Sequence, residues 1–235
     1  MVIAPEARQS PESDSEVFGK HLATNPQELL SFYVEHSKSS LVKLRGSLVA
    51  LMQNPLNQLP AIKLQTDEVA FDLCSLSPGA DLLQNPDLEI LFRHCSFASL
   101  WMNLAYICTE CQLSESENET VLTKFIRRLL TGITPEFRRL KLDPVEFAAL
   151  KAICVWKVSP LNNNSTAKVI AGEQYLGVAK ALNEYHQTKN LLDFEKAGRL
   201  ADITSLLAPI SAIYQEMSMI YAALNINDSY SGDFF

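Results

Sequence analysis

Glycine is scarce in this 235-residue chain, with only 8 residues, and no Asn-Gly or Asp-Gly pair separates alternating apolar stretches. A protein rich in β-hairpins needs such turns, so their shortage argues against a β fold. No apolar run approaches the roughly 18 residues that a membrane-spanning helix requires. The chain has 47% hydrophobic residues and a mean hydropathy of +0.02. Together with the shortage of glycine, this composition predicts a soluble, globular, mainly helical protein without membrane contact.

An excess of positive charge is also lacking, because 20 Lys and Arg stand against 27 Asp and Glu, which gives a net charge of −7. Such a chain repels phosphate backbones, so we expect no direct nucleic-acid contact by this chain. The 5 cysteines are an odd number, and the first residues do not resemble a signal peptide. These features indicate a reducing compartment rather than a secreted disulfide framework.

The motifs of common enzyme classes are missing as well: there is no P-loop, no Gly-x-Gly-x-x-Gly, no His-Glu-x-x-His and no Gly-x-Ser-x-Gly. Cys108-x-x-Cys111 has no second cysteine pair to complete a zinc site, so buried thiols are the simpler interpretation. An enzyme would need a polar cluster such as a dyad at His94 and Cys95. We therefore predict a protein that is not an enzyme and that uses no metal or cofactor.

Prolines mark several helix starts, because proline fits the first helical turn when it follows a capping residue. The four pairs are Asn25-Pro26, Asn85-Pro86, Thr134-Pro135 and Asp143-Pro144. Two of the caps are followed three residues later by Glu28 and Glu146, where a carboxylate reaches back to the cap N–H. Two basic pairs, Arg127-Arg128 and Arg138-Arg139, flank Gly132, and a solvated helix face is a simpler interpretation of them than a phosphate site.

Apolar periodicity predicts the remaining helices, with breaks at Pro55 and Pro60 and a last helix that Pro209 is able to kink. The predicted helices cover residues 26–38, 41–53, 66–76, 86–108, 119–131, 143–158, 167–187 and 193–224. The segment 86–108 is apolar on nearly all sides, which is typical of a central rod between other helices. Residues 1–24 have no apolar period and are expected to form a disordered leader or hinge remnant.

Two blocks of the sequence carry recognisable motifs. The first is Pro78-Gly79-Ala80-x-x-Leu83-x-x-x-Asp87-Leu88-x-x-Leu91-Phe92-Arg93, followed downstream by Leu104-Ala105-Tyr106. The second is L-K-L-D-P-V-E-F-A-A-L-K-A-I at residues 140–153. The first block resembles the signature of the ligand-binding domain of nuclear hormone receptors, and the second is similar to that family's eighth helix. The degenerate first block resembles the divergent receptors of nematodes, and the Leu-Ala-Tyr spacing is similar to the Nurr-type orphan group.

This resemblance implies an all-α fold, a three-layer antiparallel helical sandwich over residues 25–228, followed by a degenerate activation-helix tail at 229–235. It implies a nuclear regulator of transcription whose partners are an apolar small-molecule ligand, coregulator proteins and a second receptor chain in a homo- or heterodimer. DNA contact would require a separate zinc domain, which five scattered cysteines cannot supply. A helical carrier of apolar small molecules with no role in transcription is the alternative.

The resemblance also implies roles for individual residues. The implied ligand-pocket residues are Leu73, Leu76, Phe97, Leu100, Trp101, Asn103 and Leu104. The implied coregulator groove contains Leu76, Leu91 and Arg93, and the implied dimer interface contains Leu206, Ile210, Ile213 and Met217. A structural ion pair is expected between Glu146 and Arg199.

Two departures from the family pattern affect the expected mechanism. Leu76 stands where the family has the lysine of its coregulator clamp, and Asn103 where some members have a ligand-binding arginine. We therefore expect a weakened clamp and a neutral ligand or none. The bulk of Phe97, Trp101 and Met102 predicts a small or filled pocket.

Overall fold

The computed structural model describes residues 25–108, 120–157, 165–189 and 191–228, and every regular element in these ranges is helical. In chain order the elements are α2 (Pro26–Gln53), α3 (Pro55–Leu76), the 3-10 helix η1 (Ala80–Leu82), α4 (Asn85–Phe97), the π-helix η2 (Ala98–Met102), α5 (Asn103–Ile107), α6 (Val121–Gly132), α7 (Thr134–Leu140), α8 (Pro144–Lys157), α9 (Ser165–Thr188), α10 (Asp193–Ser205) and α11 (Leu207–Ala223). The prediction of an all-α fold is confirmed. None of the described helices is long and apolar enough to cross a membrane.

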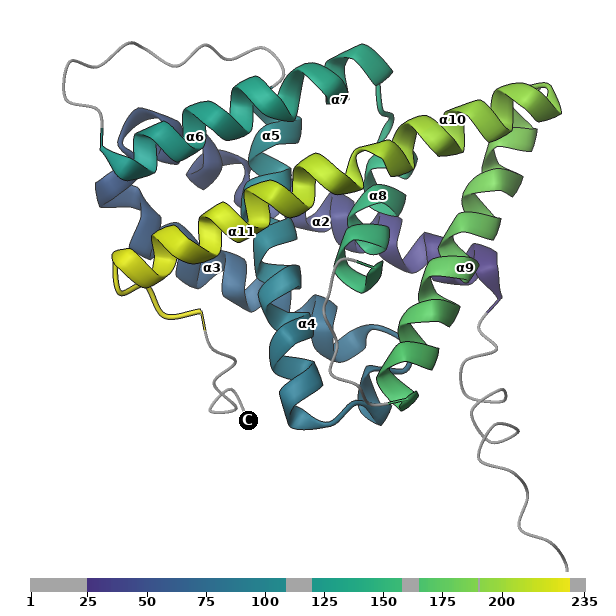
Figure 1. Cartoon of the computed structure of the whole chain (residues 1–235), viewed down its shortest axis with the longest axis horizontal. Helices are drawn as coiled ribbons and strands as arrows, with labels where there is room; N and C mark the ends of the chain where they lie inside the picture. Colours follow the sequence, from purple (N-terminus) through teal and green to yellow (C-terminus); the bar gives the residue numbers. More distant parts are fainter. Residues whose placement is uncertain (1–24, 109–119, 158–164, 190, 229–235) are drawn as a thin grey trace, which may run out of the picture.

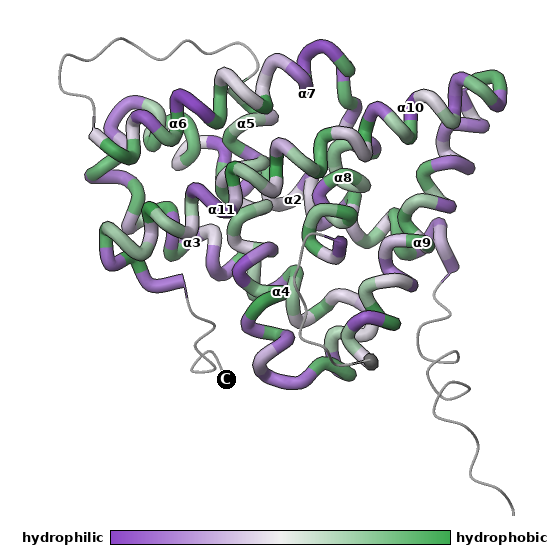
Figure 2. Tube along the Cα trace, in the orientation of Figure 1, coloured by the Kyte–Doolittle hydropathy of each residue, from purple (hydrophilic) through white to green (hydrophobic). Residues whose placement is uncertain are grey.

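The helices form layers, with α10 and α11 running across one face and α2 lying on the opposite face (Figure 1). Between them lie α8 and the rod formed by α4, η2 and α5. Hydrophobic residues predominate along α8 and the upper part of the rod, whereas hydrophilic residues gather on α7 (Figure 2). This arrangement encloses one continuous apolar core.

The central rod occupies residues 85–107, close to the predicted 86–108, but its middle is wound as the π-helix η2. A π-turn adds one residue to the helix, which rotates the following side chains by about 100° relative to a continuous α-helix. All five residues of η2 are buried. The rod therefore contacts protein on every side along this stretch.

Two predicted breaks in the first helices are wrong. Helix α2 continues without a break after residue 38. Ser40 lies within this helix, where its hydroxyl accepts a stabilising hydrogen bond from Asn103 Nδ2 at 2.8 Å. Pro60 lies inside α3, although it cannot donate to the carbonyl four residues earlier. The buried side chains Leu59 and Ile62 on either side of it hold this part of α3 in the core.

The predicted helix 193–224 is divided into α10 and α11 at Leu206. Pro209 lies four residues after Ser205, where it lacks the N–H that would bond to the Ser205 carbonyl, and its ring crowds that oxygen. The break between α10 and α11 therefore lies before Pro209 rather than at it.

Local capping starts two helices as predicted. Asn25 Oδ1 accepts from Gln27 N at 3.1 Å, and Asp143 Oδ1 accepts from Glu146 N at 3.0 Å. Asp143 N in return donates to Glu146 Oε2 at 3.1 Å, so both halves of a capping box are present. Thr134 also stands at a helix start but does not cap it, because its hydroxyl donates to the Ala105 carbonyl at 3.1 Å.

Candidate functional site

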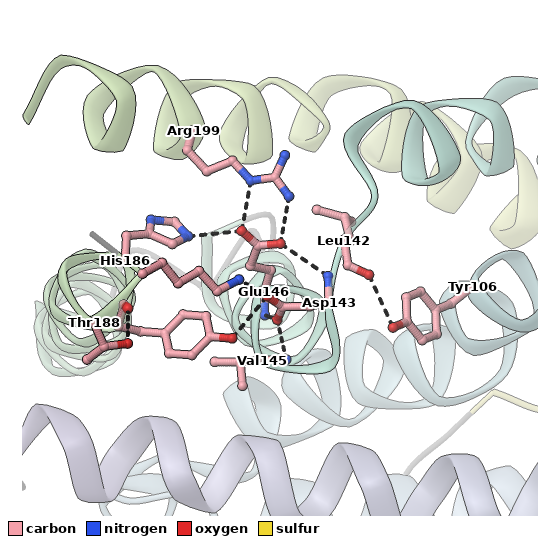
Figure 3. A network of polar contacts seen from close by, with 10 residues as sticks. Tyr106, Leu142, Asp143, Val145, Glu146, His186, Thr188 and Arg199 are labelled. Atoms are coloured by element: carbon pink, nitrogen blue, oxygen red, sulfur yellow. Dashed lines mark hydrogen bonds and ion pairs between the residues drawn. The ribbon is translucent and has the colours of Figure 1, made fainter. Parts of the chain in front are cut away.

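Glu146, in the first turn of α8, is the centre of a polar network that joins α8, α9 and α10 (Figure 3). Arg199 of α10 donates from Nε to Glu146 Oε1 at 2.7 Å and from Nη2 to Oε2 at 2.6 Å. His186 of α9 donates from Nε2 to Oε1 at 3.0 Å. Burial favours the neutral acid, but the hydrogen bonds from Arg199 and from the Asp143 backbone outweigh it and hold the pKa of Glu146 below its usual value. The structure thus contains the ion pair that the resemblance implied.

Asp143 extends this network to the C-terminal end of α9. Its Oδ2 accepts from the Tyr185 hydroxyl at 3.0 Å and forms an ion pair with Lys189. Burial raises the pKa of Asp143. The hydrogen bonds from Lys189, the Glu146 backbone and Tyr185 lower it by a larger amount, so the net shift is downward. Sequence reasoning missed Tyr185, His186 and Lys189, because nothing in a local motif places the end of α9 beside the start of α8.

A second polar cluster joins α3, α4 and the end of the described chain. Lys63 Nζ of α3 lies 2.7 Å from Asp67 Oδ1 and 3.1 Å from Asp228 Oδ1. Ser96 of α4 donates to Asp67 Oδ1 at 2.7 Å. Lys63 Nζ also lies 5.8 Å from the ring centroid of Tyr221. Because Lys63 is buried, removing these carboxylates would leave a buried charge without a partner.

Arg93 of α4, an implied groove residue, contacts the same chain end. Its Nε donates to the Asp228 carbonyl oxygen at 3.1 Å, and its guanidinium forms an ion pair with Glu89 one turn earlier. Burial raises the pKa of the Asp228 carboxyl, and Lys63 counters part of this rise. Arg93 is therefore already bonded to Asp228. The predicted tail at 229–235 lies outside the described residues.

The other implied groove residues differ in exposure. Leu76, at the C-terminal end of α3, is 65% exposed and available to a partner. Leu91 is fully buried, because that side of α4 faces the core. Leu91 is therefore not available to a partner at the surface, which corrects its implied role.

Most of the implied ligand-pocket residues lie in the core. The buried ones are Leu73, Phe97, Leu100, Trp101, Asn103 and Leu104. Leu76 is the exception, since its exposure at the end of α3 excludes it from an enclosed pocket. Trp101 is held from two sides, because its Nε1 donates to the Tyr221 hydroxyl at 2.9 Å and its ring packs edge-on against Phe125 with centroids 4.8 Å apart.

Asn103 is bonded to protein groups at both ends of its amide. Its Nδ2 donates to Ser40 Oγ at 2.8 Å, and its Oδ1 accepts from Lys151 Nζ at 2.9 Å. Lys151 of α8 is buried, and loss of hydration lowers its pKa to about 7. The Asn103 amide is thus part of a buried link from α2 to α8, and sequence reasoning did not single out Lys151.

A small cavity of about 10 Å³ lies among α4, α8 and α11, which is room for about one water molecule. It is lined by His94, Phe97, Cys154, Ile210 and Tyr214. His94 donates from Nδ1 to the Ile90 carbonyl at 2.9 Å and stacks on Tyr214 with centroids 4.2 Å apart. Burial lowers the pKa of His94 to about 4, so the ring is neutral at physiological pH.

The dyad of His94 and Cys95 that an enzyme would require is not assembled. His94 is directed to the Ile90 carbonyl, whereas the Cys95 thiol lies beside Cys74. Burial, and then the contact with Cys74, raise the pKa of Cys95, which keeps it a neutral thiol. Among the described residues, no three His, Cys, Asp or Glu side chains are grouped to hold a metal ion. Cys108 is buried, and Cys111 lies outside the described residues.

The implied dimer residues do not face outward. Leu206, Ile210, Ile213 and Met217 are all buried in the core of the same chain, because α11 turns its apolar stripe toward the interior. The outward side of α10 and α11 carries other residues, among them Ala208, Ala212, Gln215 and Met219. Any contact between two copies through α11 would therefore use this second set, which corrects the implied interface.

Comparison with known proteins gives a consistent result. A family model for the ligand-binding domain of nuclear hormone receptor matches residues 88–224. Nuclear hormone receptor family member nhr-77 of Caenorhabditis elegans is 30% identical over 230 residues, 94% of this chain and 62% of that protein. Family member nhr-169 of the same organism is 30% identical over 220 residues, 92% of this chain and 61% of that protein. Family member nhr-174 is 36% identical over 127 residues, 52% of this chain and 40% of that protein.

The chain thus spans about three fifths of the length of the first two relatives, 62% and 61%. The matched segment begins in α4 and ends just after α11, so it includes most of the rod, the Glu146 network and helices α10 and α11. Both sequence blocks that carry the resemblance fall wholly or partly within it. Because the match covers more than half of its residues, this chain belongs to the nuclear hormone receptor family, as a divergent ligand-binding domain with relatives in a nematode.

Proposed function

We propose that residues 25–228 form the ligand-binding and dimerisation domain of a nuclear regulator of transcription that is controlled by protein partners rather than by a large ligand. The observation that carries this proposal is the packing of Trp101 inside the domain. Its indole is fully buried, its N–H is bonded to Tyr221 and its ring contacts Phe125. A side chain fixed at both its polar and apolar parts fills space that a ligand would otherwise occupy.

The helices that meet at Trp101 support this proposal. Trp101 belongs to η2, Phe125 to α6 and Tyr221 to α11, so one indole joins three separate parts of the fold. Tyr221 is held in turn by the Lys63 ammonium above its ring. Displacing the indole would break the hydrogen bond between the Trp101 N–H and the Tyr221 hydroxyl. Each of these groups, if left buried without a partner, costs about 1–3 kcal/mol.

Native mass spectrometry of the purified chain, followed by extraction under denaturing conditions, tests the filled interior. We expect the protein to carry no stoichiometric small molecule. Trp101→Ala should create a cavity that binds indole, seen as a rise in melting temperature that the parent protein does not show. An apolar molecule retained at one per chain by the parent protein would contradict the proposal.

We further propose a weakened coregulator clamp at Arg93. Leu76 supplies no charge at the end of α3, and Arg93 is already bonded to the Asp228 carbonyl and paired with Glu89. A coregulator helix would have to displace the Asp228 contact before its own end could bind the guanidinium. Binding is therefore expected to be weak until that segment moves.

Fluorescence anisotropy with a panel of leucine-rich coregulator peptides tests this clamp. Arg93→Glu should abolish binding, and Asp228→Asn should strengthen it by loosening the hold of Lys63 on the segment. Arg45→Glu, an exposed arginine on α2, is the matched control and should leave binding unchanged. Equal effects of Arg93→Glu and Arg45→Glu would refute the clamp.

The third part of the proposal is dimerisation through the outward side of α10 and α11. Small side chains at Ala208 and Ala212 allow close approach of a second helix, and Met219 is 67% exposed. Analytical ultracentrifugation should detect a dimer that Met219→Glu dissociates. Leu64→Glu, an exposed leucine on α3, is the control and should remain dimeric. A parent protein that is monomeric at high concentration would exclude a homodimer.

A further inference from the structure

Helices α6 and α7 concentrate positive charge in an otherwise acidic chain. Residues 121–141 contain a single acidic residue, Glu136, and the basic residues Lys124, Arg127, Arg128, Arg138, Arg139 and Lys141. This stretch therefore has a net charge of +5, while the whole chain carries −7 and the remaining residues carry −12. All six basic side chains are exposed. We refer to these six residues as the α6–α7 basic surface.

The folding of both helices directs these charges outward. Helix α6 buries Leu122, Phe125, Ile126 and Leu129, so its positions 124, 127 and 128 face solvent. Helix α7 buries Phe137 and Leu140, which leaves positions 138 and 139 on the outside. The two helices follow one another along the upper edge of the domain in Figure 1, away from α4. The surface is thus separate from Arg93 on α4.

Only part of this charge is neutralised by the protein. Arg128 pairs with Glu216 of α11 at 3.0 Å, and Arg139 pairs with Glu136 at 2.8 Å. The Arg128 and Arg139 side chains are 66% and 56% exposed, and such pairs contribute about 1 kcal/mol or less.

Three further basic residues of this surface add to the imbalance. Lys124, Arg138 and Lys141 form no ion pair with another residue in the described part of the chain. Lys124 and Arg128 lie one turn apart on α6, where like charges repel. A bound anion would relieve this repulsion, so binding should also stabilise the fold.

We propose that the α6–α7 basic surface is a docking site for a short acidic segment of a partner protein. A 12-residue helix such as α6 is about 18 Å long, a length that one short peptide can follow. At physiological salt, attraction extends only about 8 Å, so a short segment experiences the local positive charge. A long DNA duplex or a lipid surface would also bring its phosphates near the acidic remainder of the domain, which repels them. This proposal does not depend on the function proposed above.

A fluorescent 15-residue peptide of Glu-Glu-Gly repeats is the probe, measured by anisotropy against the full chain in 50 mM NaCl. We expect saturable binding that weakens at least tenfold in 300 mM NaCl. The triple variant Lys124→Glu, Arg138→Glu, Lys141→Glu should lose at least tenfold in affinity. The control triple Lys38→Glu, Lys43→Glu, Lys180→Glu makes the same change in net charge elsewhere on the surface and should stay within twofold.

Circular dichroism checks that both triple variants fold, and Lys→Gln and Arg→Gln replacements at the same three α6–α7 positions give a second, milder test of the surface. Those neutral variants should lie between the parent protein and the charge-reversed one. The proposal is overturned if the peptide does not bind, or if the two triple variants weaken it equally. It is also overturned if a 20-base-pair duplex or phosphatidylserine vesicles bind the same surface more tightly than the peptide.

Discussion

Replacement of Arg199 by methionine tests how strongly the Glu146 network holds α8, α9 and α10 together. Methionine keeps much of the arginine's apolar length but removes both hydrogen bonds to the Glu146 carboxylate, at 2.7 and 2.6 Å. Glu146 is only 3% exposed, so water cannot replace the lost donors. Removing one partner of a buried ion pair costs about 3–5 kcal/mol.

The lower end of that range applies here, about 3 kcal/mol, since the carboxylate keeps its bonds from His186 and from the Asp143 N–H. For a domain of this size, 1 kcal/mol shifts the melting temperature by about 2–4 °C, so we expect a fall of about 6–12 °C. Differential scanning calorimetry measures this fall. Arg128→Met is the matched control, because the Arg128 side chain is 66% exposed and its ion pair with Glu216 should be worth about 1 kcal/mol or less.

The pH dependence of the same pair of proteins provides an independent check. The pKa of Glu146 is lowered in the folded state, so its contribution to stability is complete above the unfolded pKa of about 4.3 and is lost as pH falls through the folded pKa. The stabilities of the parent protein and Arg199→Met should therefore converge in acid. A cost for Arg199→Met no larger than that for Arg128→Met at neutral pH would refute the reasoning.

Three further predictions concern buried or strained positions. Lys151 has a pKa of about 7 in the folded state and about 10.4 when unfolded, so between these values the folded protein binds fewer protons than the unfolded chain. The free energy of unfolding, measured with urea, should therefore rise with pH from 7 to 10, and Lys151→Met should flatten this rise. Trp101→Ala should lose about 3–5 kcal/mol of stability, measured by urea unfolding at neutral pH, and a loss below 1 kcal/mol would mean that the indole is not packed as described. Lys141 adopts a φ of 49°, so Lys141→Gly should raise the free energy of unfolding by about 0.5–1 kcal/mol, whereas a loss would show that its side chain has a role there.

Features that depend on neighbours within one helical turn were predictable from the sequence. The capping box of Asp143 and Glu146 is closed by residues three positions apart, and the apolar periodicity of α6 or α8 is a property of the helix itself. The two family blocks also identified the ligand-binding domain, and with it the pairing of Glu146 with Arg199.

Other features were decided only by contacts between distant parts of the chain. Ser40 continues α2 because Asn103, 63 positions away, supplies a hydrogen bond. Arg93 is occupied because Asp228, 135 positions away, reaches its guanidinium. The inward orientation of Met217 likewise follows from which side of α11 meets the core.

The difference has a physical basis. A turn of helix or a capping box satisfies its own backbone groups within a few residues, so the sequence by itself determined the capped starts of α2 and α8, which residues are apolar and which family the chain belongs to. The bonds of a buried polar side chain, and the direction that an apolar stripe faces, depend on which helices pack together when the core closes. Only the tertiary structure therefore decided that the Trp101 indole is bonded to the Tyr221 hydroxyl and that Arg93 is already bonded to the Asp228 carbonyl.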